Sequence, residues 1–414
     1  MRNATLLPAP RAARRASRAA ARVSTLLLHA RRFVLQFCLS GCPIFARMFQ
    51  AKVGLSISLL LLAAAPAFPQ ATPPPEPDPL ARIRAQPPAQ VCSEAQPTLC
   101  AEAAPKIIAN AMGSDSTIEK NLGVLASGEG GHAMGAPAPQ SVVDETRAVD
   151  WAVAAFRAAG LDVHTELVPV PFNFQRPEDA APEIVVAEIR GREKPAEIVI
   201  LGARVDSGVL RGNGTSDDAC DAAVVIEAAR DIIATGLVPR RTIRFVLFPG
   251  GNSWATGSWS YVQAHRDEMD HTIAAILIGT GRTHLSAYSL GARHDTEPGV
   301  RDAVAPLGSL GAPVDRFDLG IHRDDFAFFL EGVPTLAAEG ESIGAALPDL
   351  PDMTRNAAIV GVTAFDLAEA VAPLGPRLSH QDIEALLKQS GLDEQMKKTG
   401  FWYEWETGQV GRQP

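Results

Sequence analysis

Between residues 183 and 375, apolar runs of strand length alternate with segments of helical character. Residues 197–206, 240–251 and 272–281 each hold an almost unbroken apolar run, as strands buried on both faces do. Residues 217–236 carry acidic side chains in their first turns, where they interact favourably with the helix dipole. This alternation predicts an α/β fold, a three-layer sandwich with a mostly parallel central sheet.

Composition divides the 414-residue chain into segments. The first 50 residues are rich in Arg and Ala, and the later sequences TPPPEPDP and QPPAQ predict an extended linker, because proline packs poorly. We expect an Arg-rich extension or a mis-assigned start at 1–47, a signal peptide at 48–71, a Pro-rich linker at 72–105, the α/β domain at 106–375 and a helical C-terminal tail at 376–414.

Residues 48–71 have the form of a secretory signal peptide. Met48 is followed by one Lys, by an apolar run over residues 53–65 and by the small-residue site APA. The run is too short for a typical membrane span, so we expect no transmembrane span in the mature chain. A rival sequence, LSGC ending at Cys42, resembles a lipoprotein site. Either signal exports the protein, to the periplasm or outside the cell, and Met48 is the expected start under the first.

Net charge and cysteine spacing exclude some classes of protein. The formal net charge of −9 argues against a nucleic-acid partner, because phosphate binding needs a basic face. Cys92 and Cys100 lie close together in VCSEAQPTLC, which predicts a disulfide in an exported protein. The alternative is two free thiols in a loop. No second Cys or His pair follows at the spacing of a zinc ribbon.

Charged or polar residues follow the predicted strands at three places, in RVD at 204–206, in GTSDDACD with Asp217 and Asp218, and in FPGGNSW. Together with AEIRGREKP before the first core strand and GTGRTHLSAYSLGAR after the third, the stretch 183–295 resembles the co-catalytic zinc exopeptidases. Members of that family include bacterial leucyl aminopeptidases and carboxypeptidase Q. The resemblance extends over about residues 141–375 and implies an α/β fold of the zinc-exopeptidase type.

The resemblance also implies five metal ligands and one catalytic base at the carboxyl ends of the strands. In the family, two zinc ions share a bridging Asp, each ion has a His and a further carboxylate, and a Glu takes the proton from the metal-bound water. The first ligand, the His of a His-x-Asp strand end, falls on Arg204, whereas the Asp of that motif is retained as Asp206. A guanidinium offers only donors and stays protonated, so Arg204 cannot bind zinc.

The other family positions fall on further residues of this chain. Asp217 takes the place of the bridging ligand. Gly251 takes the place of the catalytic base, and Asn252 that of the ligand beside it. Leu277, or its neighbour Ile278, takes the place of the Asp that precedes GTG. The last His of the family has no counterpart after GVP, where the chain continues TLAAEGESIGAALPDLPDM.

Four of the five ligands and the base are therefore missing, and Asp217 is the only retained ligand position. We expect a catalytically inactive relative of the metallopeptidases, without a metal cofactor, that binds a ligand or a partner, because one carboxylate gives zinc too few donors. The alternative is an active metallo-exopeptidase, an aminopeptidase, carboxypeptidase or dipeptidase, with a rebuilt zinc site. A gene product without a function is a third hypothesis.

A pocket is expected around Arg204. Its guanidinium can pair with Asp206, Asp217 or Asp218 and so replace the charge of the metal with a salt bridge. The alternative is an Arg turned to solvent beside unrelated acids. With Trp254 as one wall, the pocket can take a peptide or a small carboxylate ligand.

Two further patterns suggest other chemistry, and neither is favoured. Ser253 follows a buried strand and a Gly-Gly turn, as in a nucleophile elbow, but no His–acid pair is placed to serve it. His322 and Asp325 lie three residues apart, so a helix would bring them to one face, yet solvated surface is their expected place. Neither pattern therefore changes the expected function.

The aromatic residues outside the pocket are expected to have structural roles. Trp259 and Tyr261 follow the Gly-Gly turn and should pack a helix against the sheet. Those of the tail, in FWYEWETG, should dock on the surface of the domain.

Overall fold

The computed structural model describes Asp78, Val91 and residues 80–86, 98–127, 142–168, 183–205, 217–248, 255–311, 313–340 and 349–414. All of them belong to one compact unit, Pro77–Pro414. The predicted extension and both predicted signal sequences lie outside the described residues, so the segment boundaries expected there remain predictions.

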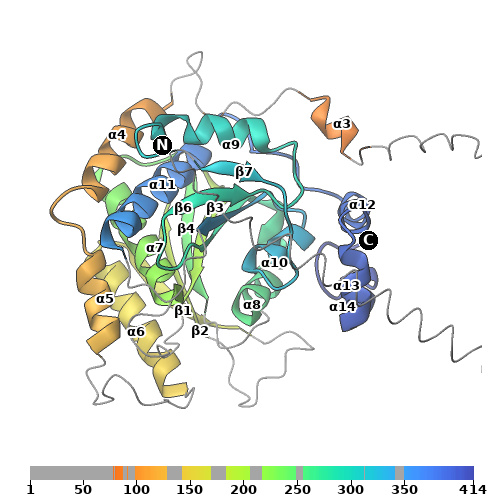
Figure 1. The fold of residues 1–414 in the computed structure, drawn as a ribbon, viewed down its shortest axis with the longest axis horizontal. Coiled ribbons are helices and arrows are strands. Elements are labelled where there is room, and N and C mark those ends of the chain that lie inside the picture. The colour runs from red at the N-terminus through yellow and green to blue at the C-terminus, as the bar shows by residue number, and fades with distance from the viewer. Residues whose placement is uncertain are drawn as a thin grey trace, which may run out of the picture. The chain divides into compact units, whose positions relative to one another are not determined.

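Within the described residues, eight strands form one sheet through the middle of the molecule (Figure 1). Their order across the sheet is β1-β2-β4-β3-β5-β8-β6-β7, and the four central strands β4, β3, β5 and β8 run parallel. The strands are β1 (Asp162–Leu167), β2 (Glu183–Ile189), β3 (Lys194–Arg204), β4 (Arg241–Phe248), β5 (Thr272–Gly279), β6 (Leu285–Ser289), β7 (Val314–Arg316) and β8 (Thr335–Gly340). The predicted α/β fold with a mostly parallel central sheet is confirmed.

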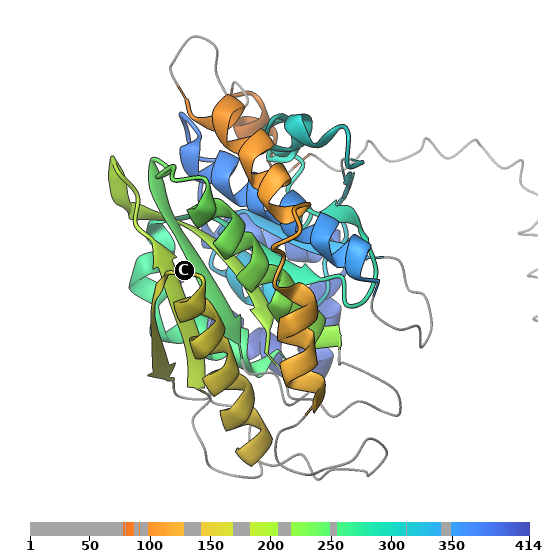
Figure 2. The ribbon, with the colours of Figure 1, turned by 90° about the vertical axis from the view of Figure 1, so that its left-hand side faces the viewer.

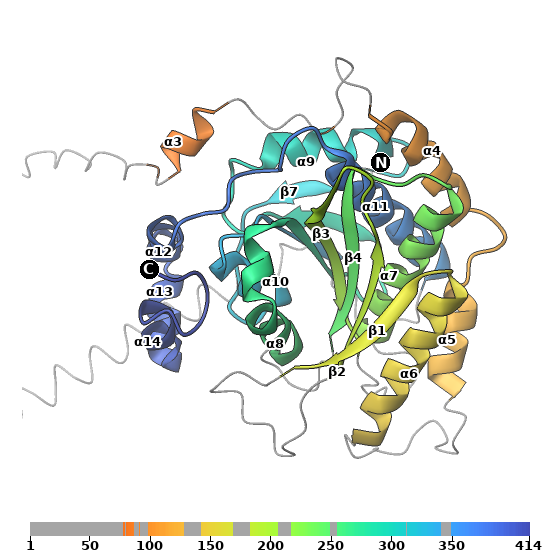
Figure 3. The same cartoon turned by 180° about the vertical axis from the view of Figure 1, so that it is seen from behind.

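Helices cover both faces of this sheet. One face carries α4 (Cys100–Ala111), α5 (Ile118–Ser127), α6 (Val142–Ala158), α7 (Asp217–Ala234) and α11 (Leu350–Glu369), which Figure 2 shows in front of the strands. The other face carries α8 (Thr256–Ala264) and α10 (Asp324–Leu330), with α12 (His380–Gln389), α13 (Leu392–Thr399) and α14 (Phe401–Glu406) outside them (Figure 3). The remaining helices are α3 (Ala81–Arg84), α9 (Glu297–Val304) and the 3-10 turns η1 (Arg266–Asp270) and η2 (Ala305–Leu307).

Alternation along each strand divides the apolar residues between two cores. On β3, Val199 and Leu201 are buried against the α7 and α11 layer, whereas Ile198 and Ile200 are buried against the α8 and α10 layer. Successive side chains of a strand point to opposite faces, so a strand covered on both sides reads as one continuous apolar run. This is the reason why the runs in the sequence predicted central strands.

The C-terminal tail is part of the second core. Trp405 is fully buried and stacks on His380 with ring centroids 4.0 Å apart, and Phe401 meets Trp259 edge-to-face at 4.9 Å. Trp259 and Tyr261 are themselves buried between α8 and the sheet, as predicted. The expected docking of the tail is therefore confirmed for Phe401 and Trp405.

Other elements complete the described fold. Residues 106–125 belong to two helices, α4 and α5, and the tail, which was expected to be helical, contains α12, α13 and α14. β2 and β3 are joined by a short turn, yet β4 inserts between them, because its apolar run pairs with both. Cys100 is disulfide-bonded; Cys92, its expected partner, lies outside the described residues. Within the part of the chain that is described, no helix has the length and apolar character needed to cross a bilayer.

We predict that Trp405→Ala lowers the free energy of unfolding by about 3–5 kcal/mol, because it leaves a cavity beneath the tail. Tyr403→Ala is the matched control on the same helix; Tyr403 is 65% exposed, and its loss should change stability by less than about 0.5 kcal/mol. Urea denaturation followed by fluorescence measures both. Equal effects of the two substitutions would contradict a tail that is integrated in the core.

Candidate functional site

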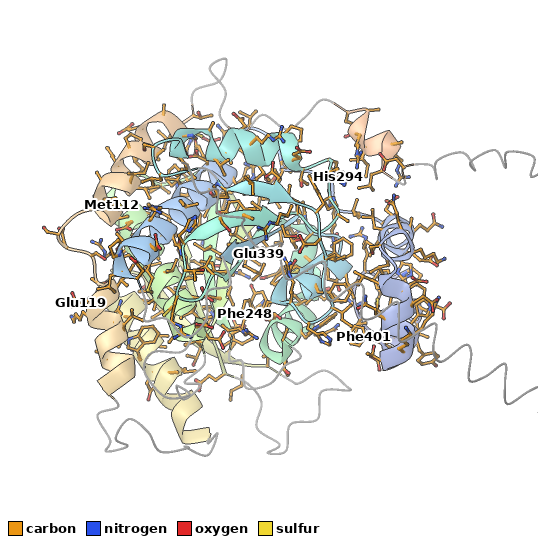
Figure 4. The ribbon with its side chains drawn as sticks, viewed as in Figure 1. Met112, Glu119, Phe248, His294, Glu339 and Phe401 are labelled. Carbon is orange, nitrogen blue, oxygen red and sulfur yellow. The ribbon has the colours of Figure 1, made fainter. Side chains whose placement is uncertain are left out.

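The candidate site lies at the carboxyl edge of the four parallel strands. There β3 ends at Arg204, β4 at Phe248, β5 at Gly279 and β8 at Gly340. Figure 4 labels Phe248 and, next to the end of β8, Glu339; both lie in the middle of the molecule in this view. Open α/β sheets place their ligand sites at this edge, so the residues that end or follow these strands are the candidates.

Arg204 is held between two carboxylates. Its Nη2 lies 3.1 Å and its Nε 3.2 Å from Oδ1 of Asp218, and its Nε lies 3.7 Å from Oδ2 of Asp324. The three side chains are 35%, 20% and 17% exposed, so the group is largely but not fully removed from solvent. Of the acids considered as partners from the sequence, Asp218 makes this contact, and Asp206 lies outside the described residues.

Asp324 is a member of the site that sequence reasoning missed. It opens α10, on the same side of the sheet as α8, and its Oδ1 lies 2.8 Å from the hydroxyl oxygen of Ser258 on α8. The available signal was a pair of acidic residues at the start of a helix, where the helix dipole favours them. That signal locates Asp324 along the chain but does not show that α10 lies beside the end of β3.

Asp217 pairs with a different arginine. Its Oδ1 accepts a 2.7 Å hydrogen bond from Nε of Arg282, and its side chain is 62% exposed. The two neighbouring acids at the start of α7 are therefore bound by two guanidinium groups, Asp218 by Arg204 and Asp217 by Arg282. Arg282 comes from the loop after β5, a second contributor that the sequence did not reveal.

The loop that carries Arg282 is held in place by hydrogen bonds to a buried carboxylate of α7. Asp221, one turn into α7, accepts hydrogen bonds at Oδ1 from the backbone N–H and hydroxyl of Thr280 and from the N–H of Gly281, at 2.9–3.1 Å. Burial, and next the charge of Asp218, raise the pKa of Asp221 to about 7, although these hydrogen bonds act to lower it. The loop thereby has a defined position relative to α7.

A second ion cluster lies at the same edge. Nε of Arg323 lies 2.9 Å from Oδ1 of Asp325, and its Nη1 contacts Asp318 at 3.2 Å and also Glu339. Arg316 reaches Glu339 at 3.2 Å. Burial raises the pKa of the Asp325 carboxyl, against the lowering effect of Arg323.

The expectation of solvated surface at His322 and Asp325 is wrong for Asp325. His322 is exposed, but Asp325 is only 1% exposed, because the first turn of α10 points it inward to Arg323. The two residues therefore do not share an exposed face.

Leu277 and Ile278, the candidates for the missing carboxylate ligand, are both core residues. Leu277 is 4% exposed and packs with the α8 and α10 layer, and Ile278 is 6% exposed and packs with the α7 and α11 layer. Register places Leu277 of β5 beside Gly202 of β3. The position is therefore filled by hydrocarbon in either alignment.

Zinc does not fit the residues described at this edge. Zinc binds imidazole, thiolate and carboxylate, whereas here a guanidinium stands between the carboxylates of Asp218 and Asp324 and contributes donors only. Among the described ranges, no group of three or more His, Cys, Asp or Glu side chains is arranged to hold a metal ion. Gly251, Asn252, Ser253 and Trp254 lie outside the described residues, as does Asp206.

Comparison with known proteins finds a family and several relatives that this domain resembles. A family model described as peptidase family M28 matches residues 185–357. Carboxypeptidase Q of Xenopus laevis is 28% identical over 159 residues, which are 38% of this chain and 33% of that protein. Carboxypeptidase Q of Homo sapiens is 36% identical over 81 residues, 20% of this chain and 17% of that protein. The matches thus span a third or less of these relatives.

Solved structures share the fold. A peptidase M28 precursor from Shewanella amazonensis SB2B superposes with a TM-score of 0.56 at 15% identity, over 68% of this chain and 99% of that one. LapA of Legionella pneumophila gives a TM-score of 0.50 at 17% identity, over 65% of this chain and 77% of that one. Over residues 185–357 the chain is therefore similar to the M28 zinc exopeptidases, and it shares their fold.

Proposed function

We propose that this chain is an exported relative of the M28 peptidases that does not hydrolyse peptides and that binds a ligand or a partner at the carboxyl edge of its sheet. The observation that carries the proposal is the position of the Arg204 guanidinium, between Asp218 and Asp324. In the family that the sequence resembles, the matching position holds a His that binds zinc.

The guanidinium supplies positive charge without a metal. Asp218 and Asp324 would repel each other if both were ionised and unpaired, and Arg204 offsets that repulsion with a permanent charge and N–H donors. A zinc ion at the same place would have to displace Arg204, which breaks its salt bridges, or lie against it, which like charges disfavour. The ion pair therefore supports a site stabilised by salt bridges.

The remaining changes act in the same direction. Gly251, at the position of the base, has no side chain to take a proton, and Asn252 brings no charge to its ligand position. Leu277 and Ile278 present only hydrocarbon. Hydrolysis through a metal-bound water needs several metal ligands and a catalytic base at the same time. Because the base and several ligands are replaced together, we favour a site that binds a peptide or small ligand without cleaving it.

Export is supported by the chemistry of Cys100. This residue is disulfide-bonded at the start of α4, and structural disulfides form mainly outside the cytoplasm. The signal-like sequence at 48–71 agrees with that compartment.

Charged groups that remain in contact with solvent support a polar ligand. Arg204 and Arg282 are 35% and 25% exposed, and Asp217 is 62% exposed. Such groups can recognise both the ammonium and the carboxylate of a peptide or a small amino-acid derivative. A peptide or small carboxylate is therefore the class of ligand that we propose.

We predict that Arg204→Met lowers the free energy of unfolding by about 1–3 kcal/mol, because it leaves Asp218 and Asp324 without the charge that offsets them. Urea denaturation at neutral pH measures the change. In the double variant Arg204→Met with Asp218→Asn, the free energy of unfolding should fall by less than the sum of the two single decreases, since the two residues form one contact.

The matched control removes a cation from an exposed pair. Lys106 and Glu102 lie 2.8 Å apart on α4 with both side chains about half exposed, so Lys106→Met should change stability by less than about 0.5 kcal/mol. If Arg204→Met were as neutral as this control, the guanidinium would not serve as the structural replacement for a metal.

We predict no turnover of aminoacyl p-nitroanilides or dipeptides by the purified chain, with or without added zinc. Arg204→His, which restores the imidazole of the family, should remain inactive, because the base and further ligands are still missing. Product release is followed by absorbance and by chromatography. Turnover by the unmodified chain that a chelator abolishes would refute the proposal and favour a rebuilt metal site.

A further inference from the structure

Another polar cluster, separate from the ion pairs of the candidate site, lies where the edge strand β1 meets α8 and η1. Glu166 of β1, His265 at the end of α8 and Glu268 of η1 form its centre. Among the described strands, β1 pairs with β2 alone and is the first strand in the order of the sheet. Any contact from α8 or η1 to β1 therefore adds to the attachment of an edge.

The central imidazole bridges two carboxylates. Nε2 of His265 lies 2.6 Å from Oε2 of Glu166, and its Nδ1 lies 3.1 Å from Oε2 of Glu268. The other oxygen of Glu166 lies 2.8 Å from Nε2 of His164, on the same strand. His265 is 17% exposed and Glu166 24% exposed, so solvent screens this bridge less than it screens an ordinary surface pair.

The ring of His265 is also fixed in orientation. It stacks on Tyr261 with centroids 4.3 Å apart, and the hydroxyl of Tyr261 lies 3.0 Å from Nη1 of Arg244. Arg244, on β4, also contacts Glu268 and pairs with Glu188 of β2 at 2.6 Å. The groups around His265 are therefore Glu166 from β1, which His164 of the same strand also contacts, Glu268 from η1, Tyr261 from α8 and Arg244 from β4.

The arrangement of these carboxylates around His265 favours binding of a proton to the imidazole over binding of a metal ion. Each imidazole nitrogen of His265 is already matched to a carboxylate oxygen at hydrogen-bond distance, as in a doubly protonated ring. The described residues contain no group of His, Cys, Asp and Glu arranged for a metal, and this cluster is among those residues.

We propose that Glu166, His265 and Glu268 form a pH-sensitive latch, which holds the edge strand β1 to the end of α8 while His265 is protonated and loosens when it is not. The proposal does not depend on whether the candidate site hydrolyses peptides.

The direction of the pH response follows from the groups themselves. Burial lowers the pKa of His265, but the hydrogen bond and charge of Glu166, with the charge of Glu268, outweigh it, so the pKa is raised above 6.5. The stabilisation that this bridge contributes is therefore complete below pH 6.5, and it is lost as the pH rises through the raised pKa of His265. The pKa of Glu166 is lowered to about 2, first by its hydrogen bond to His265. The stabilisation that ionised Glu166 contributes is therefore complete above pH 4.5 and is lost as the pH falls towards 2.

The latch is attached to a helix that also reaches the candidate site. α8 carries His265 after its last residue and Ser258 in its first turn, and Ser258 contacts Asp324 beside Arg204. An exported protein meets the pH of its surroundings, and β1 and α8 are the elements whose attachment would respond.

Hydrogen exchange measured by mass spectrometry tests the latch on the full chain. Peptides that cover β1 and the end of α8 should exchange about three- to tenfold faster at pH 8.5 than at pH 6.0, after correction for the intrinsic rate, while β3 and β5 stay unchanged. In His265→Gln the same peptides should exchange fast at both pH values, because Gln cannot be protonated. His271→Gln, an exposed His at the end of η1, is the matched control and should retain the response of the unmodified chain.

Glu166→Gln gives a second test if His265→Gln does not fold. It keeps the shape of the side chain and removes the charge, so it should likewise abolish the difference between pH 6.0 and 8.5 in β1. Equal protection of β1 at the two pH values in the unmodified chain would overturn the latch. A pH response that persists in both His265→Gln and Glu166→Gln would overturn it as well.

Discussion

Parallel pairing of β3 with β4 and with β5 decides where Arg204, the central residue of the candidate site, lies. The pairing brings the end of β3 level with the ends of its neighbours, so Arg204 reaches the edge of the sheet beside the start of α7. Side-chain alternation then points Arg204 to the face that α8 and α10 cover, where Asp324 meets it. The position of Arg204 at this edge is thus a consequence of sheet register, and the packing of α7 and α10 supplies its carboxylate partners.

The edge has the framework of a metallopeptidase, but arginine side chains rather than metal ions balance the charge of its carboxylates. A two-zinc site concentrates positive charge on ions and surrounds them with carboxylates. Here Asp217, Asp218 and Asp324 each lie near an arginine instead, and Asp221 supports the loop beneath. Salt bridges of this kind hold side chains in place but do not activate water, and for this reason we favour binding over catalysis.

Much of the fold could be predicted from the sequence, because central strands covered on both faces leave long apolar runs at β3, β4 and β5. The short strands β6 and β7 leave no such run and could not be recognised, whereas the helical tail was expected. At the site, motif spacing located Arg204, Asp217 and Asp218. It could not locate Asp324, Ser258 or Arg282, because their contacts depend on how α8, α10 and the loop after β5 pack in space. Asp325 was misjudged for the same reason.

The central claim is that a guanidinium has replaced the metal, and zinc stoichiometry tests it most directly. The chain without the segment that is expected to be its signal peptide would be loaded with zinc, desalted and measured by elemental mass spectrometry, with the Arg204→Met variant treated in parallel. We predict near zero zinc per chain for both proteins, since the described carboxylates are too few to hold the ion. One or two zinc ions per unmodified chain would contradict the claim and show that this edge still forms a metal centre.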